Sequence, residues 1–378
     1  MRRLVPSNVA HVQKQRAGVV FVINAIAWRR FCNDCAAFLS QALIVWQWWN
    51  WLFENIPSGK HALRLNLDET SICLSPSPPP GIIAIPRRKA RTITLDAPKR
   101  LRRLHMSFVA VIADDPHVQK LLPQFLIANE HTIKKSEFSD LRARMHGNVK
   151  LLRRKSAWTD AVVMVEILSE LKVALTPFTE SLQPLLLLDA APQHVSRRVL
   201  VNAGRMGLWP CVVPPHTTFG LQPLDTHAFA NFKLNLAKRY ARERENRGGG
   251  SLDLRAFLAV VNDAIHSEIT SPAWSQAFAS NGFEKDQYGM SERVRDIFGI
   301  KAISPVRSRP SLDQLAHCFP KRARISNDMA YAPLLQRRPP LHRMQRMSSR
   351  PIPQQFGKTR SQTARLRTVA RCFSDYRF

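Results

Sequence analysis

The chain has 378 residues, and its 56 Lys and Arg outnumber its 28 Asp and Glu, which gives a formal net charge of +28 at pH 7. This length excludes a chain too short to bury a core and permits one large domain or two ordinary ones. The charge favours a polyanionic partner, either nucleic acid or an anionic membrane surface. Half of that charge lies in residues 301–378, which hold 17 Lys and Arg against three Asp and Glu.

The amino-terminal part offers neither a signal peptide nor a clear metal site. Residues 1–18 are basic and lack the apolar core of a signal peptide. Of six scattered cysteines only Cys32 and Cys35 form a C-x-x-C, and no second close pair of Cys or His accompanies them, so zinc or redox chemistry is not expected there. Buried or incidental thiols in a reducing compartment are the expected state.

Residues 36–53 carry no charge, so a membrane span has to be considered. Four polar residues interrupt the stretch and four tryptophans crowd one end. We therefore expect a helix that faces the core or a partner, and a membrane-associated basic protein is the minor alternative.

Residues 61–70 alternate with a period of two, as a β-strand does. Leu63, Leu65 and Leu67 share one face, and Arg64, Asn66 and Asp68 share the other. Two explanations of Asp68 stay open at this point: a solvated carboxylate on a half-exposed edge strand, or a functional carboxylate inside the protein.

Further short strands follow this one. Residues 82–85, 105–113 and 121–129 are apolar runs, and 75–81 form a proline-rich turn, which together indicate an antiparallel meander. Residues 134–155 are mixed and basic and give no firm assignment.

The next segments alternate between helix and strand. Residues 157–175 have helical spacing, with an expected buried stripe of Trp158, Val162, Val165, Leu168, Leu171 and Leu175. The helix leads into the apolar run 185–188, which predicts a strand buried on both faces and ending at Asp189. Residues 195–206 predict a second helix, which leads into a strand at 211–213.

A loop over residues 214–220 then leads to Pro223 and Asp225 in the first turn of a long helix. Carboxylates at such ends of strands and helices can converge on one cation. One side of the long helix is basic and either faces solvent or binds nucleic acid; it carries Lys233, Lys238, Arg239, Arg242 and Arg244. Residues 252–269 and 274–283 predict helices that pack on the sheet.

The order of these elements predicts an α/β fold, a mixed sheet with helices on both faces. We expect a helical and basic segment over residues 1–59, a catalytic domain over 60–245, and a helical extension over 246–300. Residues 301–378 are rich in Pro, Arg, Ser and Gln without sustained periodicity, so they predict a disordered basic tail.

Three ordered segments resemble the DDE-superfamily transposase domain of the pogo/Tigger/jerky type, relatives of mariner elements. They are LNLDET at 65–70, LLLLDAAPQH at 185–194, and VVPPHTTFGLQPLDTHAFANFK at 212–233. The resemblance implies an RNase H-like fold, nuclear DNA as substrate, and two Mg²⁺ ions, or Mn²⁺, bound for strand cleavage and transfer. It implies a catalytic and metal-binding triad of Asp68, Asp189 and Asp225, with Glu69 and His194 as motif neighbours.

The function expected from these motifs is a transposase-derived, metal-dependent DNA endonuclease and strand transferase, with no small-molecule cofactor and with homo-oligomers possible. One departure favours an alternative, a catalytically decayed nucleic-acid-binding protein that keeps the fold. Ala190 stands where the family commonly has an Asn that could orient water or metal ligands. In addition, no complete helix-turn-helix region precedes Asp68.

Overall fold

A computed structural model describes residues 35–73, 105–249, 251–284, 306–320 and 325–335. All of them belong to one compact unit, which ends at Arg337. The pair Cys32 and Cys35, the expected strand at 82–85 and most of the expected tail lie outside the described side chains, and the domain boundaries inside the unit stay predictions.

The fold is α/β, with one mixed sheet of six strands in the order β4-β3-β2-β1-β5-β6. The strands are β1 (His61–Cys73), β2 (His105–Ala113), β3 (Gln124–Asn129), β4 (Val149–Arg154), β5 (Leu182–Asp189) and β6 (Trp209–Val213). Strand β2 pairs antiparallel with β1 and β3, and all other pairs are parallel. The other five strands therefore run in the same direction, and their carboxyl ends point to the same end of the sheet, where open α/β sheets carry their ligands. The expected meander holds for β1 to β3, but β4 runs parallel to β3.

Strand β1 lies between β2 and β5 in the sheet, so it is not an edge strand. Both of its faces are covered: Leu65 and Leu67 are fully buried on one face, and Asn66 and Asp68 are 0% and 6% exposed on the other. Because polar groups lose their hydration in such a place, each of these needs a hydrogen bond, an ion pair or a ligand.

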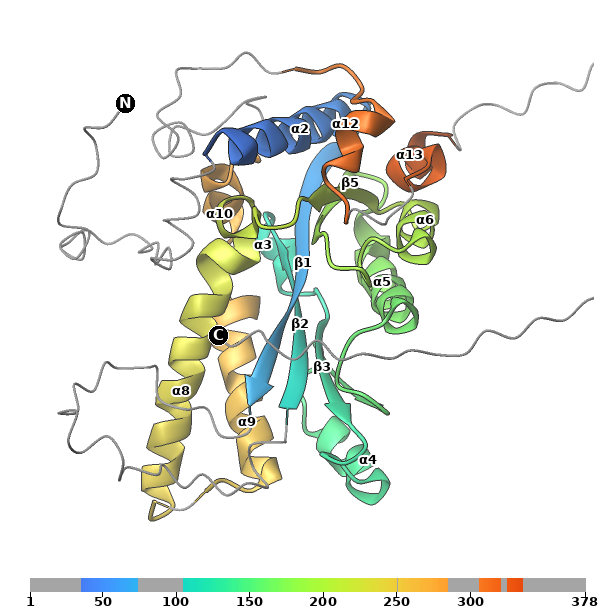
Figure 1. Ribbon diagram of the computed structural model, residues 1–378. Helices are drawn as coiled ribbons and strands as arrows, with labels where there is room; N and C mark the ends of the chain where they lie inside the picture. Colours follow the sequence, from blue (N-terminus) through green and yellow to red (C-terminus); the bar gives the residue numbers. More distant parts are fainter. Residues whose placement is uncertain (1–34, 74–104, 250, 285–305, 321–324, 336–378) are drawn as a thin grey trace, which may run out of the picture. The chain divides into compact units, whose positions relative to one another are not determined.

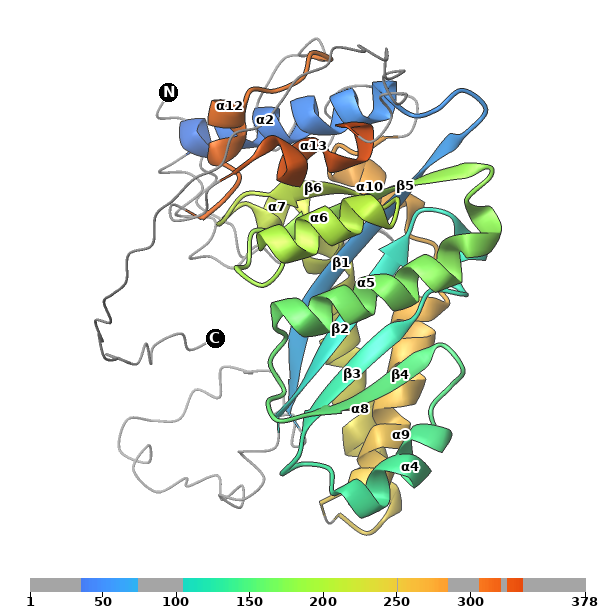
Figure 2. The ribbon, with the colours of Figure 1, turned by 90° about the vertical axis from the view of Figure 1, so that its right-hand side faces the viewer.

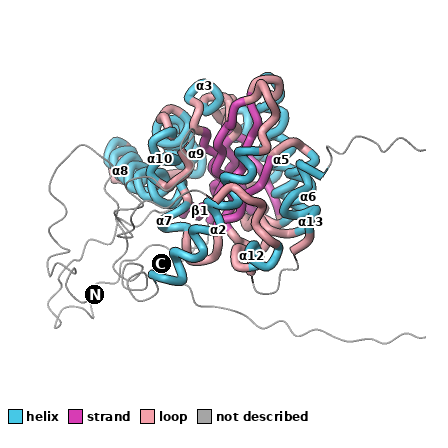
Figure 3. The backbone as a smooth tube through the Cα atoms, turned by 90° about the horizontal axis from the view of Figure 1, so that it is seen from above, coloured by secondary structure: helices cyan, strands magenta, loops and turns pink. Residues whose placement is uncertain are grey.

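Helices cover both faces of the sheet, as expected (Figures 1 and 3). Helices α5 (Ala161–Leu175) and α6 (Arg197–Arg205) lie on one face; α8 (Phe229–Asn246) and α9 (Leu254–Ile265) lie on the other. The shorter elements are α3 (Pro116–Gln119), α4 (Lys135–Ala143), η3 (Thr176–Phe178), α7 (Thr218–Leu221), the π-helical turns η4 (Leu224–Ala228) and η5 (His266–Thr270), and α10 (Ser275–Ser280). The segment without a firm sequence assignment contains α4 and β4.

The buried stripe of α5 differs from the expected one. Trp158 precedes the helix and is 75% exposed, and Val162 in its first turn is 53% exposed. The buried residues are Val163, Met164, Ile167, Leu168, Leu171 and Leu175. The helix is apolar on more than one side, so its sequence alone offered two possible stripes, and packing against the sheet selected the second.

Helix α2 (Cys35–Glu54) is a core helix, as the preferred interpretation of this uncharged stretch predicts. Val45, Trp48 and Leu52 are fully buried, and the helix packs on strand β6 at the end of the sheet. No helix in the described residues is long and apolar enough to cross a membrane. The helix also touches the end of α10: Trp46 Nε1 donates to the Asn281 carbonyl over 3.4 Å, and a Cβ at Gly282 would come within 2.6 Å of that nitrogen.

Two helices lie within the segment expected to be disordered, α12 (Leu312–Ala316) and α13 (Asn327–Leu335). For residues 306–320 and 325–335 that prediction is wrong. The reason is the unusual apolarity of α2, whose second side they cover: Trp48 stacks on Phe319, and Trp51 meets Tyr331 edge-on (Figure 2 shows α2, α12 and α13 together). Helix α13 also packs on α6.

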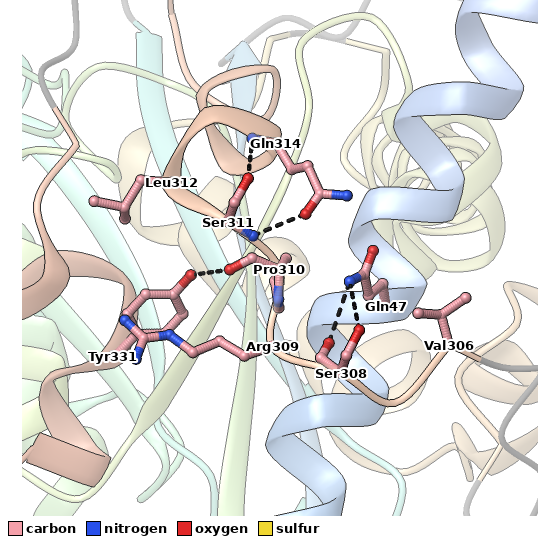
Figure 4. A pocket seen from close by; sticks show the side chains of 9 residues that line it. All are labelled: Gln47, Val306, Ser308, Arg309, Pro310, Ser311, Leu312, Gln314 and Tyr331. Atoms are coloured by element: carbon pink, nitrogen blue, oxygen red, sulfur yellow. Dashed lines mark hydrogen bonds between the residues drawn. The ribbon is translucent and has the colours of Figure 1, made fainter.

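An open depression of about 710 Å³ lies between α2 and this carboxyl-terminal segment (Figure 4). Its polar groups bond to one another. The Gln47 side chain donates a hydrogen bond to Ser308. Ser311 and Gln314 bond to each other and cap the start of α12. The Tyr331 hydroxyl donates to the Pro310 carbonyl. The depression includes none of the three aspartates, so the candidate site lies elsewhere.

Candidate functional site

The three aspartates come from three different elements. Asp68 lies within β1, Asp189 is the last residue of β5, and Asp225 lies in the turn η4 that opens α8. Backbone pairing between β1 and β5 stops at Asn66 and Leu187, two residues before Asp68 and Asp189. Both carboxylates therefore stand where the two strands have stopped pairing.

Asp68 and Asp189 form a tight cluster with His194. One potential ligand atom from each of the three residues lies within 4.8 Å of the others. Asp225 is outside this trio, but its charge is among the main influences on Asp68, and the charge of Asp189 acts on Asp225. The structure thus brings all three predicted aspartates into one electrostatic neighbourhood, with His194 in the closest contact.

The pKa values reflect this crowding. Burial raises the pKa of Asp68 well above its usual range, and the charges of Asp225 and Asp189 raise it further. The Glu69 N–H, which donates to Asp68 Oδ1 over 2.7 Å, opposes that rise. Part of the Asp225 side chain is in contact with solvent. Loss of hydration nevertheless raises its pKa, and a hydrogen bond from Thr218 opposes that rise.

The donor set fits a hard divalent cation. Carboxylate oxygens are the ligands that Mg²⁺ and Mn²⁺ prefer. The charges of Asp225 and Asp189 raise the pKa of Asp68, and a cation among these carboxylates would remove that repulsion. Asp68 and Asp189 are the residues best placed to hold such an ion, with Asp225 beside them.

His194 fixes the orientation of Asp189. Its Nδ1 hydrogen-bonds to Asp189 Oδ1, which also accepts from the Ala191 N–H over 3.0 Å. The imidazole is 1% exposed, and its Nε2 is buried without a hydrogen-bond partner in the described part of the chain. The tight turn after β5 therefore holds one oxygen of Asp189 from two directions.

Glu69 belongs to the same neighbourhood, and Gln193 is a contact that the sequence did not indicate. Gln193 Nε2 donates to Glu69 Oε1 over 2.9 Å. Glu69 Oε2 is buried without a partner among the described residues, and burial raises the pKa of Glu69, while His194 lowers it. The only sequence signal for Gln193 was its position beside His194.

The basic residues of α8 lie on its solvent side. Lys233, Lys238, Arg239 and Arg242 are all exposed. Lys233 lowers the pKa of Asp225, so this end of the basic face reaches the cluster of aspartates. Arg239 donates to Ser267 over 3.0 Å, and no ion pair joins Lys238 or Arg242 to the rest of the described residues.

Comparison with known proteins gives little. No family model matches the chain, and no curated protein matches it. Two solved structures are similar, a Mos1 transposase paired-end complex with the left transposon end and a Mos1 mariner paired-end complex with Mn. Each is 16% identical at a TM-score of 0.30; the first match covers 74% of this chain and 69% of that one, and the second 72% and 67%. A likeness this weak decides neither fold nor function.

Proposed function

We propose that the chain is a metal-dependent DNA endonuclease and strand transferase of the DDE type, with an RNase H-like fold. The observation that carries this proposal is the convergence of Asp68, Asp189 and Asp225 beside the point where β1 and β5 stop pairing, where burial and the charges of Asp225 and Asp189 raise the pKa of Asp68. The ordered motifs around these residues support a relationship to pogo/Tigger/jerky transposases.

In this proposal the aspartates bind divalent cations, Mg²⁺ or Mn²⁺. Such ions supply electrostatic stabilisation of the entering and leaving oxygens when a phosphodiester bond breaks. Asp68 and Asp189 act as ligands from neighbouring strands, and Asp225 contributes from the start of α8. His194 and the Ala191 N–H hold Asp189 Oδ1, and the second oxygen of Asp189 is the atom proposed to bind the cation.

DNA is the proposed partner, and the basic face of α8 is the surface on which its backbone would lie. Lys233 stands near Asp225, and Lys238, Arg239 and Arg242 continue away from it along the helix. Exposed Lys and Arg bind phosphates without reading sequence. A nuclear location and assembly into homo-oligomers belong to the same proposal.

A second function has one specific observation in its favour. Ala190 is 7% exposed and has no side-chain amide, whereas the family that the chain resembles commonly has an asparagine at this position. A chain of this kind would keep the fold and bind DNA without cutting it.

Nicking of supercoiled DNA separates the two functions. Wild-type protein should nick it with Mg²⁺ or Mn²⁺ but not in EDTA. Asp189→Asn keeps Oδ1 as an acceptor for Ala191 and His194 but removes the charge. It should therefore lower the rate by about 10²–10³-fold, the equivalent of several kcal/mol of metal-dependent stabilisation, and leave DNA binding intact.

The matched control is Asp263→Asn, because Asp263 is a 61% exposed carboxylate on α9. This variant should nick at the wild-type rate. Equal nicking by wild type and Asp189→Asn would refute the assignment of Asp189. DNA binding without nicking by any of the proteins would establish the binding-only function.

A further inference from the structure

Asn66 is a fully buried amide in the middle of the sheet. It precedes Asp68 by two residues on β1, so both side chains leave the same face of the strand. Burying an amide is unfavourable unless both its donor and its acceptor find partners. The partners of Asn66 are therefore informative.

The first partner lies on the strand that ends in Asp189. Asn66 Nδ2 donates to the Leu187 carbonyl of β5 over 3.2 Å. Asn66 and Leu187 are also the last residues at which β1 and β5 pair. The side-chain amide thus binds a backbone acceptor at the point where the two strands stop pairing.

The second partner lies at the turn that carries Asp225. Asn66 Oδ1 accepts from the Leu224 N–H over 2.8 Å. The first N–H groups of a helix have no partner within it, and no side chain of the cap residue Pro223 satisfies them. Asn66, on strand β1, therefore caps the turn η4 at Leu224, the residue before Asp225.

We infer that Asn66 is a positioning residue that joins the three elements bearing the three aspartates, and that it sets the spacing of their carboxylates for a divalent cation. It does this through one donor and one acceptor on a short, rigid side chain. The inference rests on the proposed function, because its purpose is the geometry of that metal site.

The chemistry of the two bonds explains why other residues would not serve. Leucine fills a similar volume but makes neither bond. Threonine suits a strand and can make one of them. Aspartate would lose the donor to Leu187 and add another negative charge beside Asp68, whose pKa is already raised.

The test compares Asn66→Leu with a matched control, Asn262→Leu. Asn262 is another buried asparagine, 5% exposed on α9, and its Oδ1 accepts from the His146 N–H over 3.3 Å. Thermal melting without metal reports the cost of removing a buried amide. Titration with Mn²⁺, followed by electron paramagnetic resonance, reports the metal site, and DNA binding and nicking are measured on the same proteins.

We expect both leucine variants to lower the melting temperature, but only Asn66→Leu to weaken Mn²⁺ binding, by about 10–100-fold, as the loss of a residue that orients metal ligands does. It should lower the nicking rate at saturating DNA and leave the DNA dissociation constant unchanged. Asn66→Thr should weaken Mn²⁺ binding by an intermediate factor, and it carries the test if Asn66→Leu does not fold.

Unchanged Mn²⁺ affinity in a folded Asn66 variant, or an equal loss in Asn262→Leu, would overturn the inference even if the wild type nicks DNA. If instead wild type binds Mn²⁺, the Asn66 variants bind it more weakly and no protein nicks DNA, the proposed activity is wrong and the positioning role stands. Absence of Mn²⁺ binding by the wild type would overturn both.

Discussion

Arg64→Met should destabilise the protein strongly, because Arg64 belongs to a buried ion pair on the strand that carries Asp68. Its Nε donates to Asp114 Oδ2 over 2.7 Å, and the two side chains are 6% and 5% exposed. The Arg64 N–H donates to Asp114 Oδ1 over 2.9 Å, and the guanidinium also bonds to the Phe283 carbonyl. Methionine would fill most of the space and leave the Asp114 carboxylate buried without its cation.

Breaking a buried pair in this way costs about 3–5 kcal/mol. For a folded unit of this size each kcal/mol shifts the melting temperature by roughly 2–4 °C, so the drop should be on the order of 10 °C. The double variant Arg64→Met/Asp114→Asn should recover a large part of the loss. It has no unpaired charge, and the amide oxygen of the new asparagine side chain can still accept from the backbone N–H of residue 64.

Thermal melting followed by circular dichroism at neutral pH measures these differences in metal-free protein. The control is Arg144→Met, which breaks an exposed pair with Asp140 whose side chains are 60% and 42% exposed; its effect should stay below about 1 kcal/mol. A double variant as unstable as Arg64→Met would refute the reasoning, since the loss would then not come from an unpaired charge.

Three further predictions concern the charge of the site and the binding of DNA. Because the folded-state pKa of Asp68 is raised, the metal-free fold binds more protons than the unfolded chain between the ordinary and the raised pKa, and its stability falls as pH rises through that window. Asp68→Asn should therefore melt higher than wild type at neutral pH, with the difference shrinking in acid, and it should no longer gain stability from Mn²⁺; an equal melting temperature at all pH values would contradict this. Removing residues 338–378 should weaken DNA binding and flatten its salt dependence, with the melting temperature unchanged. Removing all residues after 300 should have the same effects on binding. It should also lower the melting temperature, because it uncovers Trp48 and Trp51. Replacing Lys238 and Arg242 with alanine should lower the salt slope by roughly 2, and an unchanged slope would show that α8 does not bind phosphates.

The local pattern was sufficient where one segment's own periodicity decides the outcome. The alternation over residues 61–70 indicated a strand, and the apolar run 185–188 indicated a strand buried on both faces; both are present as β1 and β5. Strand β2 spans the predicted residues 105–113. The polar face of β1 also signalled function, since a buried Asn and Asp on one face are costly without partners.

The sequence was insufficient where a remote segment decides. Which side of α5 is buried depends on how the helix lies on the sheet, so Trp158 was wrongly placed in the core. Residues 306–320 and 325–335 are ordered because they cover an apolar side of α2, a helix more than 250 residues earlier in the chain. Composition describes a segment by itself and does not show the contacts with α2 and α6 that order this one.

By itself the sequence determined strands β1, β2, β3, β5 and β6, most of the described helices, and the positions of three aspartates within or at the ends of those elements. Only the tertiary structure decided that His194 is in closest contact with Asp189, that Asp225 stands beside the tightest cluster, and that Asn66 joins all three elements. The physical reason is that periodicity fixes which face of an element a residue occupies. The atoms that meet across elements depend on strand order and on where pairing stops, and no local pattern encodes either.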